Sequence, residues 1–198
     1  MPFVDSEPSV YGDASLGVTS VKVVIAGGFG VGKTTLVGSI SEITPLSTEE
    51  LITEQSEGID DLTGVETKTT TTVAMDFGRV TLNSDLVLYL FGTPGQDRFW
   101  FLWDELSSGA IGAVVLADTR RLEDCFPSLD YFEGRGIPFV VGVNCFDRGL
   151  RYTVEEVREA LDLGPQAPVK LCDVRRRESG KDLLITLVTH VISMVTMS

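Results

Sequence analysis

One segment near the N-terminus constrains the fold more than any other. Its sequence, GGFGVGKT at residues 27–34, fits the pattern G-x-x-x-x-G-K-[ST] at every fixed position. A continuous apolar run, residues 21–26, precedes it, and a helical pattern over residues 33–41 follows it. A glycine-rich turn between a buried strand and a helix N-terminus is the context that this pattern requires. The segment therefore predicts a phosphate-binding loop in a parallel α/β sheet rather than an ordinary glycine turn.

Each fixed residue of the loop has a physical role. Glycines let backbone N–H groups curl around phosphate oxygens, and the positive end of the helix dipole favours the same anion. Lys33 would offset the charge of the β- and γ-phosphates, and the Thr34 hydroxyl would ligate magnesium. We expect the following residues to bind the nucleotide: Gly27, Gly28, Phe29, Gly30, Val31, Gly32, Lys33, Thr34 and Thr35.

Strand and helix patterns alternate along the rest of the chain. Further strands are expected at 73–82, 86–91, 111–117, 137–143 and 169–172, with helices at 98–106, 122–133, 154–161 and 178–195. The first two of these strands flank Asn83-Ser84, which predicts a hairpin turn. Alternation of strands and helices predicts a three-layer α/β fold of the P-loop NTPase class. Its sheet should have six strands, mostly parallel, with one antiparallel strand from the hairpin.

The 198 residues suffice for one domain with a sizeable core. Residues 1–19 are polar, acidic and rich in Ser, Gly and Pro, and we expect a disordered N-terminal arm there, followed by a single domain over residues 20–198. Residues 41–67 contain eight acidic side chains and no Lys or Arg. This stretch is interpreted as a mobile, solvated loop or as a docking face for a basic partner.

Charge and composition exclude several functions. A net charge of −13 argues against a nucleic-acid partner, because such binding needs a cationic surface. The three cysteines, Cys125, Cys145 and Cys172, lack metal-site spacing and favour a reducing cytoplasm. No apolar run is long enough for a transmembrane segment.

Four further motifs follow in the order found in nucleotide switches. They are TVAMDF at 72–77, GTPGQ at 92–96, NCFD at 144–147 and CDV at 172–174. With the phosphate-binding loop, this order resembles a Ras-like small GTPase. The resemblance implies that Thr72 senses the γ-phosphate through magnesium and that Gln96 orients the attacking water. Lys33, Thr72 and Gln96 are then the catalytic residues, and Thr34 and Thr72 hold Mg²⁺.

The same resemblance makes Asn144 and Asp147 the guanine reader, with Cys172, Asp173 and Val174 beside the base. The Asp147 carboxylate can accept two hydrogen bonds from guanine N1–H and N2–H₂, whereas adenine offers no such donor pair. Asn144 would face the other way and brace the phosphate-binding loop. Cys145 stands where a lysine stem usually covers the base, so we expect guanine specificity with weakened affinity.

Longer sequence segments make the resemblance more specific within the small GTPases. AGGFGVGKTT, TKTTTTVAMDFGRV and LYLFGTPGQDRFWF are similar to the MglA-like bacterial GTPases, and most similar to the actinobacterial conservon ATP/GTP-binding proteins. That family implies GTP and GDP as ligands, a roadblock/LC7 partner and a complex with a sensor histidine kinase. It also implies a cytoplasmic protein that partners recruit to the inner face of the cell membrane.

The chain departs from the Ras pattern at Gly92, where an Asp usually contacts magnesium through water. Asp76 lies near in sequence but inside the hairpin strand, so Asp118, after the next buried strand, is the preferred substitute. Phe29 stands where the Ras pattern has a glycine; its ring either crowds the γ-phosphate side of the pocket, or it turns outward or packs on the switch II segment. No Arg lies between Ser41 and Thr72 to act as an intrinsic arginine finger, and Lys68 and Arg98 are the nearby cations. Because little would stabilise the charge that develops during hydrolysis, we expect slow intrinsic hydrolysis.

Aromatic residues mark a candidate partner surface after Gln96. Phe99, Leu102, Trp103 and Leu106 fall on one helical stripe, whereas Trp100 and Phe101 fall off it. The off-stripe residues form a partner site, or the helix is buried all round. The last helix carries a stripe from Leu183 to Val195 that predicts packing on the sheet, and its His190 is a surface or packing residue.

Together these features predict a GTP-dependent molecular switch with slow hydrolysis. The alternative is a nucleotide-binding scaffold with little or no hydrolysis. A small P-loop kinase fits less well, because the chain has no arginine-rich lid and the motif at 144–147 would have no role.

Overall fold

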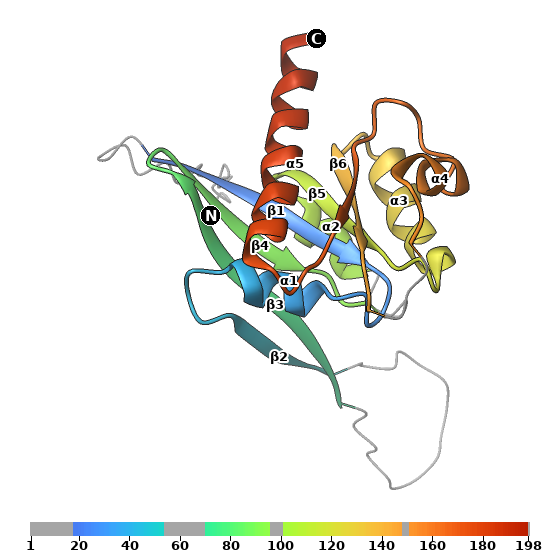
Figure 1. Ribbon diagram of the computed structural model, residues 1–198. Coiled ribbons are helices and arrows are strands. Elements are labelled where there is room, and N and C mark those ends of the chain that lie inside the picture. The colour runs from blue at the N-terminus through green and yellow to red at the C-terminus, as the bar shows by residue number, and fades with distance from the viewer. Residues whose placement is uncertain (1–17, 54–69, 96–100, 148–150, 198) are drawn as a thin grey trace, which may run out of the picture.

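The protein is described by a computed structural model that covers residues 18–53, 70–95, 101–147 and 151–197, with backbone alone at 46–53 and 70–74. Seven strands form one sheet in the order β2-β3-β4-β1-β5-β6-β7 (Figure 1). The strands are β1 Thr19–Gly27, β2 Leu46–Thr53, β3 Thr70–Asn83, β4 Leu86–Gly92, β5 Ala110–Ala117, β6 Phe139–Asn144 and β7 Val169–Cys172.

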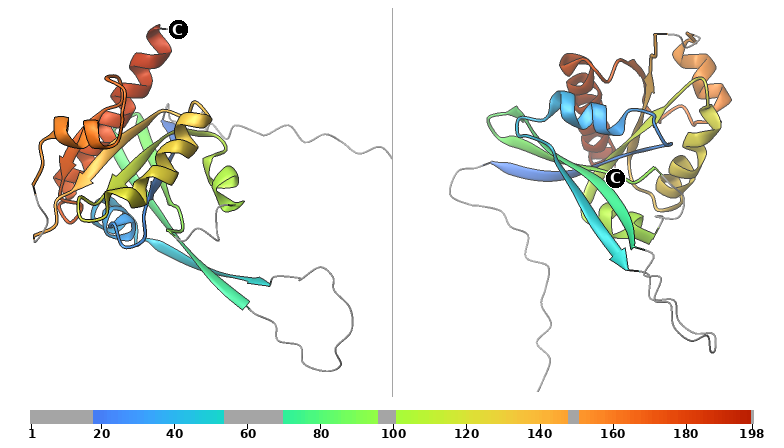
Figure 2. Two further views of the ribbon diagram at one scale, coloured as in Figure 1. Left: turned by 90° about the vertical axis from the view of Figure 1, so that its right-hand side faces the viewer. Right: turned by 90° about the horizontal axis from the view of Figure 1, so that it is seen from below.

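Helices cover both faces of this sheet, which gives the three layers (Figures 1 and 2). One face packs against α1 and α5, and the other against α2, α3 and α4. The helical elements are α1 Lys33–Ile40, α2 Phe101–Ser107, the 3₁₀ turn η2 Leu122–Cys125, α3 Phe126–Gly134, α4 Val154–Ala160 and α5 Arg177–Met197.

Strand β1 is buried on both faces, as its continuous apolar sequence predicts. Val23 and Ile25 pack with the α1 and α5 side, whereas Val24 and Ala26 pack with the opposite layer. β1 pairs in parallel with β4 on one edge and with β5 on the other, so chain order reverses at β1. Ligands of such sheets bind beyond the carboxyl ends of the strands at this reversal, which is where the segment 27–34 lies.

The expected fold class is confirmed, and all six expected strands are present. β3 is the one antiparallel strand, since it pairs antiparallel with both β2 and β4. The sheet has a seventh strand, β2, inside the acidic stretch that we expected to be a loop. The hairpin turn is Ser84-Asp85 rather than Asn83-Ser84, because Asn83 already pairs with Leu86.

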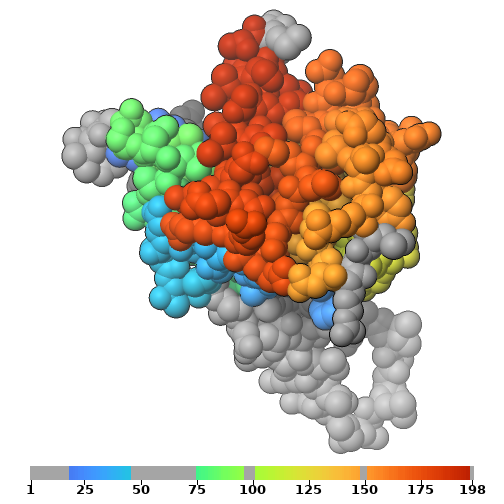
Figure 3. Space-filling model, in the orientation of Figure 1, coloured from blue at the N-terminus to red at the C-terminus, as the bar shows by residue number. Residues whose placement is uncertain are grey.

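Two helical expectations need correction. The helix expected at 122–133 is divided into η2 and α3, and Pro127 lies in the first turn of α3, where its missing N–H costs no helical hydrogen bond. The stripe on α5 is buried at Leu183, Leu184 and Leu187, whereas Val195 is 72% exposed. The last turns of α5 rise above the body of the domain (Figure 3).

Helix α2 agrees with the expected stripe where it is described. Trp103 and Leu106 are buried, and Phe101 is 60% exposed. Phe99 and Trp100 lie outside the described residues, so the interpretation of Trp100 as a partner contact stays a prediction. Among the described helices, none combines the length and the apolar character that crossing a membrane requires.

Candidate functional site

The glycine-rich segment joins β1 to α1 by a turn that only glycine fits at two positions. Gly27 has φ 131°, and a Cβ atom there would lie 2.4 Å from the Leu116 carbonyl oxygen. Gly32 has φ 110°, and its Cβ would lie 2.9 Å from a Val174 methyl group and 3.0 Å from the Asn144 amide nitrogen. The loop is thus seated against the ends of β5, β6 and β7, with α1 starting immediately after it.

Lys33 is held inside this loop. Its ammonium group donates hydrogen bonds of 2.8 Å to the carbonyl oxygens of Gly27 and Gly28. Only 8% of the residue is exposed, and burial lowers its pKa to about 8, although the charge of Asp76 opposes that shift. A lysine that is poorly solvated and has few anionic partners will gain from a phosphate group placed beside it.

A carboxylate lies directly across the sheet from Gly92, the position where the usual Asp is missing. Asp76 on β3 is paired directly with Gly92 on β4. A Cβ atom on Gly92 would lie 3.1 Å from the Asp76 Cβ and 3.2 Å from its Oδ2. That same Oδ2 accepts a 2.6 Å hydrogen bond from the Thr34 hydroxyl. Asp76 therefore occupies the space next to Thr34 that a side chain at position 92 would reach.

Asp118, the preferred substitute carboxylate, is paired with Arg120 in the structure, and its role toward magnesium stays a prediction. Asp118 is buried at the end of β5 and is occupied by Arg120, whose Nη2 lies 2.6 Å from Asp118 Oδ2. The backbone N–H of Arg120 also donates to Asp118 Oδ1, and the guanidinium stacks 3.7 Å from the ring centroid of Phe146. These bonds with Arg120 lower the pKa of Asp118 and fix it as a structural ion pair.

A pocket of about 290 Å³ opens beside the loop, and Phe29 forms part of its wall. Phe29 is 65% exposed, which agrees with the outward orientation. Its carbonyl oxygen accepts a 2.8 Å hydrogen bond from Arg121, which follows β5. On the other side, a Cβ at Gly95 would lie 2.7 Å from the Lys33 ammonium, so the segment after β4 lies directly on the phosphate-binding loop.

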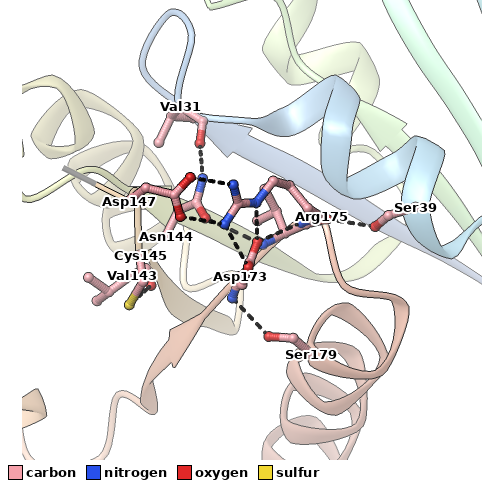
Figure 4. A network of polar contacts seen from close by, with 10 residues as sticks. Val31, Ser39, Val143, Asn144, Cys145, Asp147, Asp173, Arg175 and Ser179 are labelled. Carbon is pink, nitrogen blue, oxygen red and sulfur yellow. Dashed lines mark hydrogen bonds and ion pairs between the residues drawn. The ribbon is translucent and has the colours of Figure 1, made fainter. Parts of the chain in front are cut away.

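Asn144 connects this loop to the opposite end of the site (Figure 4). Its amide donates a 3.0 Å hydrogen bond to the Val31 carbonyl oxygen, and its Oδ1 accepts one from the Val174 N–H. The expected brace is present, and Asn144 is buried. The loop that carries Lys33 and the loop after β7 are therefore fixed relative to each other.

Asp147 lies beyond Asn144 and is paired with Arg175. Arg175 Nη1 and Nη2 lie 2.8 and 2.9 Å from the two Asp147 carboxylate oxygens (Figure 4). Arg175 also donates to Asp173, and these bonds lower the pKa values of both carboxylates. Cys172 differs from the expectation in one respect, because its side chain is buried in the core and burial raises its pKa to about 12. Only the backbone of Cys172 can contribute at the surface.

Several predicted site residues are not tested by the described structure. Gln96, Arg98 and Lys68 lie outside the described residues, and Thr72 lies on β3 where the backbone alone is described. Their catalytic and metal-binding roles stay predictions. The structure also brings three further residues to the site, namely Asp76, Arg121 and Arg175. Of these, Asp76 had a usable signal, since an Asp on the hairpin partner of a strand ending in Gly92 faces it across the ladder.

The fold and the site define a class: a P-loop nucleotide-binding protein with a G-domain fold. The cytosolic domain of the FeoB iron transporter of T. maritima in apo form has a TM-score of 0.62 and 19% identity. That match covers 87% of this chain, and the chain spans 64% of that structure. The FeoB G-domain of Methanococcus jannaschii gives a TM-score of 0.59 and 12% identity over 88% of this chain and 99% of that one.

The family follows from the sequence itself. Residues 25–194 match the family described as "Conserved hypothetical ATP binding protein". Uncharacterized protein MJ1339 of Methanocaldococcus jannaschii is 31% identical over 170 residues, which is 85% of this chain and 94% of that protein. The chain belongs to this family of P-loop proteins.

Proposed function

We propose that the protein is a guanine-nucleotide-binding switch that hydrolyses GTP slowly. The observation that carries this proposal is the Asn144 brace, which joins the loop holding Lys33 to the edge of the sheet that presents Asp147. The brace supports a phosphate site and a guanine-reading carboxylate that would lie at the same edge of the sheet. FeoB structures of the same fold have been solved in GDP and GMPPNP forms.

Magnesium would accompany the nucleotide, and the donor set fits it. The Thr34 hydroxyl and the Asp76 carboxylate are oxygen ligands side by side, which suits Mg²⁺ with phosphate oxygens completing its shell. Thr72 would join them when the γ-phosphate is present. Bound magnesium supplies charge neutralisation on the phosphates, while Lys33 holds their oxygens and Gln96 orients the attacking water.

The cellular setting is proposed from the family resemblance of the sequence motifs. We infer a role in a signalling complex with a roadblock/LC7 protein and a sensor histidine kinase, which would recruit the protein to the cell membrane. Partner binding would use the segment from Gln96 to Phe101, whose last residue is exposed. A scaffold that barely hydrolyses GTP is distinguished from a switch by single-turnover hydrolysis in the presence of the partner.

Nucleotide choice tests the proposal directly, since the family description names ATP. Calorimetry with GDP, ADP and XDP should show GDP bound at least about 100-fold more tightly than ADP, because adenine leaves Asp147 without its paired donors. Asp147→Asn should move the preference to XDP, since an amide can donate to the 2-keto group of xanthine. Asp130→Asn, an exposed change on α3, is the control. Equal ADP and GDP affinities in the wild type would contradict the guanine assignment.

The lowered pKa of Lys33 predicts that nucleotide binding takes up a proton in mildly alkaline solution. In the free protein this pKa is about 8, against an ordinary value of 10.5, and bound phosphate charges raise it again. Above pH 8 the free site is increasingly neutral, so GDP affinity should fall by up to about tenfold per pH unit. Calorimetry at pH 9 in two buffers of different ionisation enthalpy measures the uptake. An affinity that does not change from pH 7 to pH 9 would contradict this assignment.

A further inference from the structure

Arg175 makes a complete two-point contact with the proposed base reader. Two of its nitrogens each donate to a different oxygen of Asp147, at 2.8 and 2.9 Å. Its Nε and Nη2 donate to Asp173 at 2.9 Å each, so one guanidinium joins two carboxylates (Figure 4). Such fork-to-fork pairs are the strongest geometry that an arginine and a carboxylate can form.

The guanidinium presents to Asp147 the same pattern that guanine would. Guanine offers N1–H and N2–H₂ as two roughly parallel donors on one edge, and Arg175 offers Nη1–H and Nη2–H in the same arrangement. One carboxylate cannot accept two such parallel pairs in the same plane at once. The guanine edge and Arg175 therefore exclude each other at Asp147.

The surroundings of Arg175 allow it to leave Asp147 without losing every partner. Asp173 holds the Arg175 side chain through Nε and Nη2 and also accepts from its backbone N–H at 3.1 Å. Asp173 is itself fixed, because its own N–H donates to the Ser179 hydroxyl at the start of α5. Displacement would thus break the bonds to Asp147 and leave those to Asp173.

We propose that Arg175 is a built-in competitor of the guanine base, which occupies Asp147 in the empty site and must be displaced when a nucleotide binds. This inference rests on the proposed guanine-nucleotide function. It explains how an exposed carboxylate stays oriented for recognition while no base is present, and it makes Arg175 a residue that sets the association rate. A ligand with phosphates but no base does not meet Arg175.

The first test compares GDP with inorganic tripolyphosphate on the wild type, Arg175→Ala and the control Arg176→Ala. Arg175→Ala should bind GDP about three- to fivefold more tightly, the range expected for loss of one partly exposed ion pair. Stopped-flow measurements should assign the gain to faster association with unchanged dissociation. Tripolyphosphate affinity should not change in either variant, and Arg176→Ala should match the wild type with both ligands.

The second test is independent of nucleotide. Arg175 holds the pKa of Asp147 below its usual range. Carboxyl-carbon NMR of the nucleotide-free protein should therefore show the Asp147 pKa rising in Arg175→Ala and staying in place in Arg176→Ala. In an Asp147→Asn background, adding Arg175→Ala should leave XDP affinity unchanged, because the two-oxygen carboxylate for which the base and Arg175 compete is gone.

The outcomes separate this inference from the function on which it rests. Equal GDP affinity in the wild type and Arg175→Ala, or faster dissociation in the variant, would overturn the competitor role and leave the guanine function standing. Absence of GDP binding in both proteins, with tripolyphosphate still bound in a Lys33-dependent way, would overturn the guanine function and this inference with it. Faster association confined to Arg175→Ala supports both.

Discussion

Lys33→Ala is expected to remove nucleotide binding while the domain stays folded. Lys33 provides the fixed positive charge inside the loop, where its ammonium group donates to the carbonyl oxygens of Gly27 and Gly28. Losing charge-assisted bonds to two phosphate groups should cost at least about 2.8 kcal/mol, which is about 100-fold in GDP affinity. Calorimetry with GDP measures this loss, and thermal unfolding reports on the fold.

The control for this prediction is Lys181→Ala, which makes the same charge change on α5. That variant should bind GDP as the wild type does. GDP affinity of Lys33→Ala within about threefold of the wild type, a difference below about 1 kcal/mol, would contradict the assignment of the phosphate-binding loop.

We expect that the carboxylate beside Thr34 can be supplied from β4, at position 92, in place of Asp76 on β3. Asp76→Ala is expected to weaken GDP binding about 10- to 100-fold in the presence of Mg²⁺, a range typical of losing a group that tunes a metal site. In EDTA the same variant should resemble the wild type. Because a side chain on Gly92 would enter the space of the Asp76 carboxylate, the double variant Asp76→Ala with Gly92→Asp should recover most of the Mg²⁺-dependent affinity.

Gly92→Asp alone is the informative control for that exchange. Its new side chain would meet Asp76 at about 3 Å, so two carboxylates would share one space and repel each other. We expect this single variant to unfold at lower temperature than either the wild type or the double variant. If the double variant bound GDP no better than Asp76→Ala in Mg²⁺, the exchange of carboxylates across the ladder would be wrong.

Much of the sheet was predictable from the sequence because buried parallel strands leave continuous apolar runs. β1, β5 and β6 are such runs, and the glycine pattern after β1 placed the phosphate-binding loop. β2 was missed since its sequence, LSTEELIT, has neither alternation nor an apolar run. An edge strand gains its order from pairing with one neighbour, here β3, and a pairing between distant segments leaves little trace in local composition.

The site was predictable where its residues follow one another in the chain and less so where they meet across strands. Lys33 and Thr34 belong to a local motif, whereas Asp76 reaches Thr34 only through the register of β3 with β4. Arg175 belongs to the basic run at residues 175–177, which follows the last strand. Its fork on Asp147 depends on how the loops after β6 and β7 meet, and spacing in the sequence does not show this.

The position of Asp76 beside Thr34 depends on the register of β3 with β4, in which Asp76 pairs with Gly92. In the proposed magnesium site the acidic residue belongs to β3, so a bound ion would act on the β2–β3 ribbon, which extends outward to the edge of the described sheet (Figure 2). The hairpin turn sets the register of β3 against β4, because a shift of one residue would turn Asp76 to the opposite face of the sheet. Binding or loss of the nucleotide would thereby act on β2, the strand at one edge of the described sheet.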